Sequence, residues 1–330
     1  MDLKEKIHSN DLVIPLMGLP GIKMTKSTLK ENLFDEHMQF KSLSMLVDSF
    51  EPDGIFAFMD LTVELDALGL KVRYPENDNP SVIEHPIKTI GDFENLRKNW
   101  NGLSGRMLMF IDLMKKMANY FPIINGAYVI GPFSMAGELM GVNNIALEVV
   151  LNPGLVKTIL GFCTDIIKEY TLGLFEAGAD TVAILEPTAV ILSPAHYKEF
   201  SLKPVKKLTE SIKQDIILHI CGDTTHLIED MNDSGAFALS LDSDVSLKEV
   251  KNHISDDIAI IGNLDPTNIF LQGSKYTVRK ATNILKKEMK DRSNFIISSG
   301  CDLPLETPLE NIEVFMETSR IKEIESDVNS

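Results

Sequence analysis

Short apolar runs alternate along the chain with longer segments in which apolar residues recur every three to four positions. The runs are rich in Val, Ile and Phe, and several are almost entirely apolar, which is typical of parallel strands buried on both faces. The longer segments have the periodicity of amphipathic helices. Eight such runs occur, at residues 12–16, 54–59, 123–130, 181–185, 216–220, 236–241, 258–262 and 295–299. This alternation of strand and helix predicts an α/β protein.

Several helix boundaries are marked by characteristic residue pairs. A good N-cap residue followed by proline predicts a helix start. Such pairs are Asn152-Pro153, Ser193-Pro194, Asp265-Pro266 and Thr307-Pro308. Gly178 and Gly235 each precede a predicted strand and suit the left-handed conformation that ends a helix. The chain from residue 152 onward is therefore predicted to form a regular series of βα units.

Eight βα units favour a single (β/α)8 barrel of the TIM type over an open doubly wound sheet. No G-x-G-x-x-G turn or Walker loop follows any of the runs, so the usual signatures of nucleotide binding are missing. The first 120 residues are less regular, with a long helical stretch near residues 27–50 and a polar connection through residues 73–86. We expect residues 1–330 to form one domain, in which residues 1–120 include irregular segments that cap the barrel.

Charge and composition narrow the possible partners and the compartment. The chain has 32 Lys and Arg against 48 Asp and Glu, a formal net charge of −16, which repels nucleic-acid phosphates and anionic lipids. No run approaches the ~18 apolar residues of a membrane span, and the first residues do not resemble a signal peptide. Three cysteines spread along the chain argue against a secreted disulfide framework. We expect a cytoplasmic protein that binds neither nucleic acid nor membranes.

Polar residues close most of the apolar runs, at the positions where a barrel carries its reactive groups. The clearest signal is His219-x-Cys221 together with Cys301. Residues two apart on a strand project from the same face, and closure of a barrel would bring the end of the eighth strand to the same mouth. Two thiolates and one neutral imidazole suit Zn²⁺ and leave a fourth position open, as in catalytic zinc sites.

The alternative is that these residues are simply buried or hydrogen-bonded, as cysteine and histidine often are. The placement of two cysteines at strand ends of one barrel face favours zinc. Cys163 lies inside the helix predicted to begin at Pro153, and we expect it to be part of the core.

The motifs around this triad resemble those of the zinc methyltransferases of the uroporphyrinogen decarboxylase superfamily, above all the methylcobamide:coenzyme M methyltransferases. The resemblance lies in residues 217–224, 240–242, 262–266 and 300–311, and earlier in residues 61–69 and 131–134. In that family the H-x-C sequence and the late cysteine bind zinc, which matches His219, Cys221 and Cys301. The resemblance implies a zinc enzyme that moves a methyl group from a methylated corrinoid, such as methylcobalamin, to a thiol such as coenzyme M or to a folate.

The chain has no D-x-H-x-x-G corrinoid-binding motif, so we expect the corrinoid to arrive on a separate protein that docks over the barrel mouth. The heme-pathway decarboxylases of the same superfamily lack the zinc triad and carry an Arg-rich N-terminal loop. This chain has no arginine before Arg73, which disfavours a uroporphyrinogen decarboxylase-like reaction. Glu186-Pro187 stands where the family often has Asp-Pro, so the identity of the acceptor cannot be carried over.

The other polar residues at strand ends are candidates for the remaining roles. Asp242 follows Cys221 by 21 residues, a spacing similar to that of the displaceable carboxylate ligand of cobalamin-independent methionine synthases. It is either a fourth zinc ligand or a carboxylate that orients His219. Acceptor or proton handling is assigned to Glu186 and Asp265, and substrate binding to Asn263, Asp302, Asp60 and Glu64. Each has a structural alternative, which for Asp265 is capping of the helix at Pro266, and for Asp60 and Glu64 closure of the N-terminal loops.

Two other functions stay open from the sequence. One is the demethylating component of a methyl-transfer system, which passes methyl from a methoxylated or methylamine compound to cob(I)alamin, with the zinc as Lewis acid. The other is a module that stores metal or binds corrinoid without turnover. Loss of methyl from methylcobalamin in the presence of a thiol would distinguish the leading interpretation from both.

Overall fold

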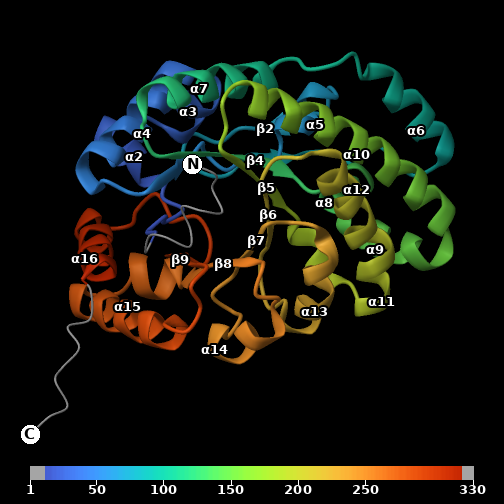
Figure 1. The fold of residues 1–330 in the computed structure, drawn as a ribbon. Helices are drawn as coiled ribbons and strands as arrows, with labels where there is room; N and C mark the ends of the chain where they lie inside the picture. Colours follow the sequence, from blue (N-terminus) through green and yellow to red (C-terminus); the bar gives the residue numbers. More distant parts are fainter. Residues whose placement is uncertain (1–11, 322–330) are drawn as a thin grey trace, which may run out of the picture.

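The structure, a computed structural model, describes residues 12–321, and its centre is a curled parallel β-sheet with helices on its outside (Figure 1). The sheet has seven strands in the order β1-β4-β5-β6-β7-β8-β9, so strands that follow one another along the sheet also follow one another along the chain. All neighbouring pairs are parallel. The strands are β1 (Gly54–Phe56), β4 (Ile124–Ile130), β5 (Thr181–Leu185), β6 (Ile216–Ile220), β7 (Ala238–Leu241), β8 (Ala259–Leu264) and β9 (Phe295–Ser299).

The first predicted strand is present only as a short bridge between the two edges of the sheet. Val13 forms an isolated parallel bridge with Ile297 of β9, and the Val13 carbonyl accepts a hydrogen bond from the N–H of Asp53, just before β1 (3.1 Å). Pro15 has no N–H and cannot extend this pairing, and the next N–H, that of Leu16, donates to the Ser299 hydroxyl instead (3.1 Å). The prediction of eight full strands is therefore wrong for this run, although the curled sheet is consistent with a TIM-type barrel.

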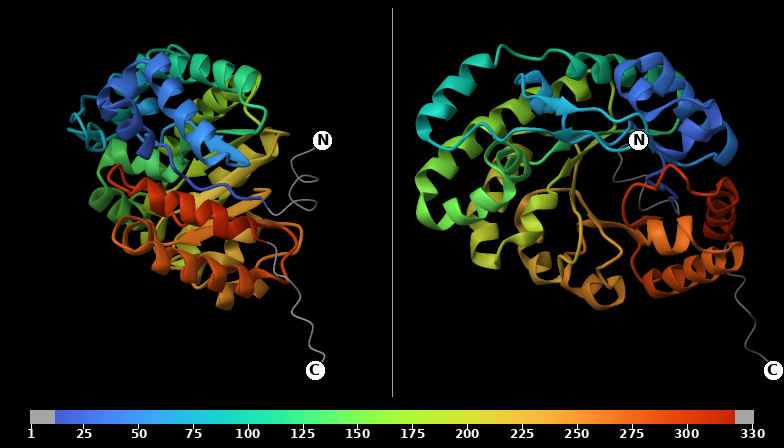
Figure 2. Two further views of the ribbon diagram at one scale, coloured as in Figure 1. Left: turned by 90° about the vertical axis from the view of Figure 1, so that its left-hand side faces the viewer. Right: turned by 180° about the vertical axis from the view of Figure 1, so that it is seen from behind.

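The helices lie around the outside of the sheet, as the side and rear views show (Figure 2). None in the described part of the chain is both long and apolar enough to cross a membrane. The α-helices are α2 (Pro20–Thr25), α3 (Leu29–Phe34), α4 (Glu36–Phe50), α5 (Val63–Ala67), α6 (Ile90–Leu96), α7 (Arg106–Tyr120), α8 (Pro132–Met140), α9 (Val142–Leu151), α10 (Pro153–Glu176), α11 (Pro194–Tyr197), α12 (Lys203–Ser211), α13 (Ile228–Met231), α14 (Leu247–Val250), α15 (Lys275–Met289) and α16 (Leu309–Arg320). Short 3₁₀ or π turns are η1 (Arg97–Asn99), η2 (Pro187–Ile191), η3 (Lys198–Leu202), η4 (Thr225–Leu227), η5 (Asn232–Ser234), η6 (Lys251–His253) and η7 (Pro266–Leu271).

The four predicted helix starts are confirmed to within one residue. Helix α10 begins at Pro153, α11 at Pro194 and η7 at Pro266. Helix α16 begins at Leu309, one residue later than the pair suggests, because Pro308 is its N-cap. The predicted left-handed glycines are confirmed, with φ of +103° at Gly178 and +75° at Gly235.

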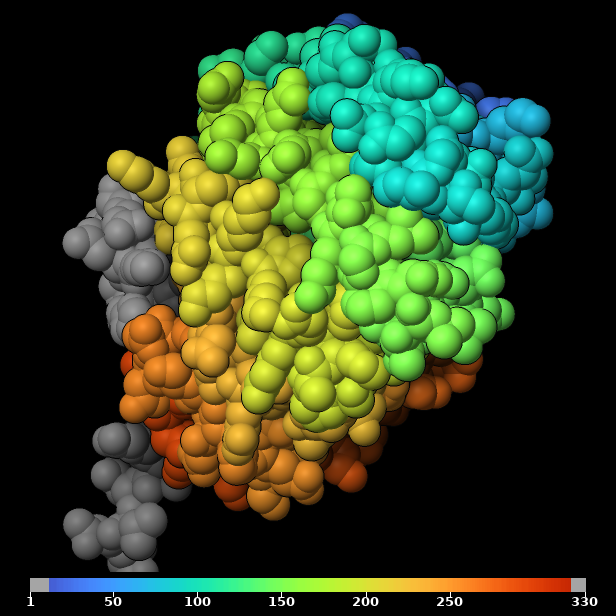
Figure 3. Space-filling view, turned by 90° about the vertical axis from the view of Figure 1, so that its right-hand side faces the viewer, coloured from blue at the N-terminus to red at the C-terminus, as the bar shows by residue number. Residues whose placement is uncertain are grey.

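The N-terminal third of the chain is irregular, as predicted. The helical stretch near residues 27–50 is two helices, because Asp35 ends α3 and its carboxylate accepts hydrogen bonds from the first turn of α4. The polar connection forms a small antiparallel pair, β2 (Val72–Arg73) with β3 (Ser81–Val82), and then packs onto α8, where the Ile87 N–H donates to Leu139 O (3.0 Å). In the space-filling view this cyan segment lies against the green segment that follows β4 (Figure 3).

Side chains on each strand alternate between the interior of the curled sheet and the helices. On β6, Leu218 and Ile220 belong to the apolar layer under the helices, whereas Ile217 and His219 line the interior. Most of the side chains that fill the interior are apolar, among them Phe56 and Ile296, although Thr181 and Ser240 also line it. His219 is therefore one of few polar side chains on this face, placed at the carboxyl end of its strand.

Candidate metal centre

His219, Cys221 and Cys301 come together at the carboxyl ends of β6 and β9. The His219 Nε2 atom lies 3.2 Å from Cys221 Sγ, and Cys221 Sγ lies 4.0 Å from Cys301 Sγ. One donor atom from each residue fits within 4.8 Å of the other two. Strands β7 and β8 separate β6 from β9 in the sheet, so the curl of the sheet brings the two sulfurs together across 80 residues of sequence.

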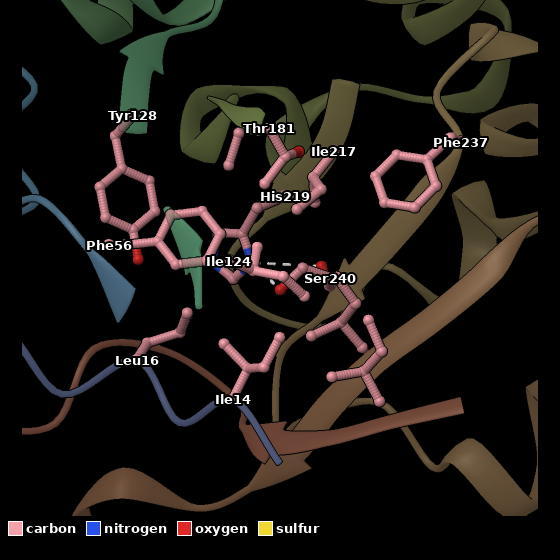
Figure 4. A pocket seen from close by; sticks show the side chains of 13 residues that line it. Ile14, Leu16, Phe56, Ile124, Tyr128, Thr181, Ile217, His219, Phe237 and Ser240 are labelled. Atoms are coloured by element: carbon pink, nitrogen blue, oxygen red, sulfur yellow. Dashed lines mark hydrogen bonds between the residues drawn. The ribbon is translucent and has the colours of Figure 1, made fainter. Parts of the chain in front are cut away.

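The orientation of His219 leaves one ring nitrogen free to bind a metal. Its Nδ1 atom lies 3.1 Å from the Ser240 carbonyl oxygen and 3.0 Å from the Ser240 hydroxyl (Figure 4). A carbonyl oxygen only accepts hydrogen bonds, so Nδ1 carries the proton and Nε2 directs its lone pair toward the thiols. Ser240 faces His219 because β6 and β7 pair in register at these two residues. The sequence had marked Ser240 only as part of a motif and not as a site residue.

The two thiols influence each other's ionisation. Contact with Cys301 lowers the pKa of Cys221, whereas contact with Cys221, together with burial, raises the pKa of Cys301. Burial by itself lowers the pKa of His219, but its contact with Cys301 and the nearby Asp242 raise that pKa overall. One thiolate therefore forms more readily than the second, and a divalent cation is the group that would hold both in the anionic form.

Asp242 lies near the triad, but its carboxylate is bound to the loops after β6 and β7. Oδ2 accepts a hydrogen bond from the N–H of Gly222, next to Cys221 (3.0 Å), and Oδ1 accepts from the N–H of Asp244 (3.1 Å) and the Ser243 hydroxyl (3.2 Å). It is not part of the cluster of donor atoms. The residue that accepts from His219 Nδ1 is Ser240 and not Asp242, which contradicts the alternative that Asp242 orients His219. The role of Asp242 as fourth ligand stays a prediction.

Glu186 is buried and joins three elements. Its carboxylate accepts hydrogen bonds from the N–H groups of Phe133 and Ser134 (both 2.8 Å) and from the Ser134 hydroxyl (2.7 Å), in the first turn of α8. Its own N–H donates to the carbonyl of His219 (2.9 Å). Burial raises its pKa to about 7 despite these hydrogen bonds. A Cβ at Gly131 would lie 2.2 Å from Glu186 Cδ, so the tight packing of this carboxylate requires glycine there.

Asp60 and Glu64 are also engaged inside the fold. Asp60 forms a buried ion pair with Arg106 and accepts two hydrogen bonds from Thr62 (both 2.7 Å). Arg106 pairs in addition with Asp66 (3.2 Å). Glu64 Oε1 accepts from the N–H of the last residue of β4 (3.0 Å), and burial raises the pKa of Glu64 to about 8. Asp60 still borders a cavity, whereas Glu64 is enclosed by protein.

Asn263 and Asp265 hold the backbone of two loops, the one after β7 and the one after β8. Asn263 Nδ2 donates to the carbonyls of Asp242 (2.8 Å) and Val245 (2.7 Å), which fixes the loop that carries Asp242. The Asp265 carboxylate accepts from the N–H groups of Thr267 and Asn268 (both 2.8 Å) at the start of η7. This is the capping role that the sequence offered as its alternative.

Two spaces flank the triad, one apolar and one open. The interior of the sheet contains a small apolar cavity of about 20 Å³ that is bordered by His219, Ser240 and Tyr128 (Figure 4). Cys301 and Asp302 border a second, larger cavity of about 330 Å³. Burial and the neighbouring Cys301 raise the pKa of Asp302 well above its ordinary value. The triad thus adjoins the larger cavity through Cys301, and Asp302, the next residue, is a predicted substrate-binding residue that borders this cavity.

Comparison with known proteins gives one family across most of the chain. The model of the uroporphyrinogen decarboxylase (URO-D) family matches residues 21–321. A methylcobamide:CoM methyltransferase, MtbA, of Methanosarcina acetivorans is 31% identical, and the match covers 96% of this chain and 97% of that protein. A uroporphyrinogen decarboxylase of Prochlorococcus marinus is 30% identical, covering 82% of this chain and 80% of the relative.

Solved structures of the same fold include enzymes of methyl transfer. A methyltransferase from Methanosarcina mazei superposes with a TM-score of 0.84 at 21% identity, covering 96% of both chains. A B12-independent methionine synthase from Shewanella superposes with a TM-score of 0.65 at 13% identity, covering 94% of this chain and 98% of that one. At these identities the likeness establishes the fold alone.

Proposed function

The chain belongs to the uroporphyrinogen decarboxylase family, and we propose that within it this protein is a zinc-dependent methyltransferase that moves a methyl group from a methylated corrinoid to a thiol. The corrinoid would be delivered by a separate protein that docks over the carboxyl ends of the strands. The observation that carries the proposal is the cluster of one imidazole nitrogen and two sulfurs within 4.8 Å, beside an open cavity.

The donor set fits Zn²⁺ in charge, softness and number. His219, Cys221 and Cys301 would supply three protein ligands, and the side toward the larger cavity would receive the acceptor. Zinc bound there would lower the pKa of an acceptor thiol, so that a thiolate capable of attacking a methyl group is present at neutral pH.

Residues around the triad would orient its ligands and keep the acceptor sulfur nucleophilic. Ser240 fixes the tautomer and the ring orientation of His219 through Nδ1. Asp242 holds the loop that follows Cys221 through the N–H of Gly222. The two thiolates bring enough negative charge to cancel that of a divalent cation, so an acceptor thiolate would remain electron-rich and nucleophilic. The apolar interior beneath the triad excludes water from that side.

The metal triad favours this function over porphyrinogen decarboxylation. The resemblance to the superfamily implies that its decarboxylases lack the His-Cys-Cys set. Decarboxylation of a porphyrinogen would also need cations for several carboxylates, and the residues that line the larger cavity include no Lys, Arg or His among the described residues.

An anoxic assay with methylcobalamin tests the proposal. We expect a thiol to convert methylcobalamin to cob(I)alamin, followed by absorbance, at a rate proportional to the concentration of zinc-loaded protein. Cys301→Ala and Cys221→Ala should lose both bound zinc, measured by elemental analysis, and methyl transfer. Cys163→Ala is the matched control, because Cys163 is buried in α10 and should retain both properties.

Three results would contradict the proposal. These are full activity of the Cys301→Ala protein without zinc, tight zinc binding without loss of methyl from methylcobalamin, and reaction only in the opposite sense. In the last case cob(I)alamin and a methylated substrate would give methylcobalamin, which is the behaviour of a demethylating component.

A further inference from the structure

The cavity next to Cys301 has a distinctive composition. Its volume of about 330 Å³ is at the lower end of ligand pockets and suits a small molecule. Apolar and proline side chains form most of its wall, and its polar groups are one amide, two carboxyl groups and one thiol. The lining residues are Leu19, Met59, Asp60, Leu61, Asn79, Pro80, Cys301, Asp302 and Pro304. Within the part of the chain that the structure describes, this lining contains no Lys, Arg or His.

The cation behind the cavity is not available to a ligand. Arg106 contacts Asp60, but its three nitrogens already bind Asp60, Asp66 (3.2 Å) and the Thr62 hydroxyl (2.9 Å). The guanidinium also lies over the rings of Phe34 and Tyr74, and its side chain is 5% exposed. Asp60 and Arg106 therefore act as one neutral unit, and releasing the guanidinium toward a ligand would leave a buried carboxylate unpaired.

Near Pro304, the positive charge of Lys23 is already engaged in an ion pair. Lys23 pairs with the carboxylate of Glu306 (3.6 Å), two residues beyond Pro304. The chain as a whole carries a formal net charge of −16. With two metal-bound thiolates and an acceptor thiolate, the proposed metal centre would add a further negative charge to this side of the cavity.

We propose that the acceptor is a small thiol whose tail is uncharged or cationic, and that this cavity selects against thiols with a sulfonate or carboxylate. The inference rests on the proposed function and specifies its acceptor. An anionic tail in this cavity would face the negative charge of the proposed metal centre, and no Lys, Arg or His among the described lining residues would offset that repulsion. A hydroxyl or ammonium tail can instead donate hydrogen bonds to the Asn79 amide oxygen and the Asp302 carboxyl oxygens, whichever protonation state Asp302 has.

A matched series of two-carbon thiols tests the tail directly. The thiols are 2-mercaptoethanesulfonate, 2-mercaptoethanol and cysteamine, which share the reacting end and differ in carrying a sulfonate, a hydroxyl or an ammonium group. The kcat/KM of zinc-loaded protein with methylcobalamin is measured for each thiol, with the thiol concentration expressed as that of the free thiolate. The hydroxyl and ammonium thiols should exceed the sulfonate thiol by at least tenfold.

The outcomes separate the two proposals. If thiols react but the sulfonate thiol is preferred, the inference about the acceptor is overturned while methyl transfer to a thiol stands. If no thiol releases cob(I)alamin, the proposed function fails and the inference fails with it.

A single added cation provides a second measurement. Asn79→Lys places a positive charge on the cavity wall and should raise the kcat/KM for the sulfonate thiol relative to the hydroxyl thiol at least tenfold. Asn283→Lys adds the same charge on the exposed side of α15, outside the cavity, and should leave that ratio unchanged. Equal ratios in the two variants would overturn the proposal, because the cavity charge would then not determine the choice of acceptor.

Discussion

Glu64 is a buried carboxyl group whose ionisation should make the free energy of unfolding depend on pH. Its Oε1 accepts a hydrogen bond from the N–H of Ile130 (3.0 Å), and its Oε2 has no hydrogen-bond partner among the described residues. Burial raises its pKa to about 8, with a smaller contribution from Asp60, against the lowering effect of backbone hydrogen bonds and of Arg106. The group is therefore protonated in the folded protein over a range in which the unfolded chain has lost the proton.

The sign of the effect follows from this difference in bound protons. A carboxyl whose pKa rises from 4.5 to about 8 on folding contributes stability that is fully present below pH 4.5. This contribution decreases as the pH rises from 4.5 and is lost once the pH has passed 8. One pKa unit corresponds to about 1.4 kcal/mol. Between pH 6 and pH 9 the loss extends over about two units, so this one group should lower the free energy of unfolding by about 3 kcal/mol.

Urea denaturation of wild type and Glu64→Gln at several pH values between 6 and 9 measures this contribution. Glutamine mimics the protonated carboxyl and keeps an acceptor for the Ile130 N–H, so the variant should lose about 3 kcal/mol less than wild type over the range. Glu186, whose pKa is also raised, to about 7, titrates in both proteins and cancels in the difference. Glu210→Gln, an exposed position on α12, should follow the wild-type curve. Parallel curves for wild type and Glu64→Gln would refute the reasoning.

The remaining predictions concern the packing of Glu186 and the orientation of His219. Gly131→Ala should lower the free energy of unfolding by about 3 kcal/mol, because its Cβ would lie 2.2 Å from Glu186 Cδ. Gly154→Ala, with nothing within 4 Å of its Cβ, should stay within about 1 kcal/mol of wild type; similar losses in urea denaturation would contradict this. Ser240→Ala should weaken zinc binding about tenfold and no further, because the backbone carbonyl still accepts from Nδ1. Chelator competition checks this, and an unchanged affinity would show that the hydroxyl does not orient the ring.

Most of the strand positions could be predicted from sequence because buried parallel strands are short and almost wholly apolar. The runs at residues 181–185, 216–220 and 295–299 coincide with β5, β6 and β9. Residues 12–16 are equally apolar, but Pro15 removes a backbone donor, so hydrophobicity predicts a strand where hydrogen bonding allows only a bridge. The start of α16 lies one residue after Pro308, because a proline that suits the first helical position also suits the N-cap.

The candidate metal centre could be predicted from the sequence because its ligands depend on the alternation of side chains along one strand and on the order of the strands. His219 and Cys221 share a face by the period of two, and Cys301 follows the last strand of the curled sheet. Ser240 was missed because its role depends on the register between β6 and β7, which no pattern in either strand specifies. Arg106 was missed for a similar reason, since it lies in a helix 46 residues from Asp60 and nothing local links the two.

The carboxylates at the strand ends show why position in a barrel does not by itself identify a catalytic group. The first turn of a helix leaves N–H groups without partners, and a carboxylate at the end of the preceding strand or of a neighbouring strand is a near and strong acceptor. Asp265 and Glu186 both bind such N–H groups, at the starts of η7 and α8 respectively. The His219 side chain differs, because its Nδ1–H donates to the Ser240 carbonyl and the lone pair of Nε2 is left facing two sulfurs. A ring nitrogen whose lone pair is directed at other ligand atoms, because the second ring nitrogen is already hydrogen-bonded, indicates a metal ligand. A carboxylate whose oxygens accept hydrogen bonds from backbone N–H groups indicates a helix cap.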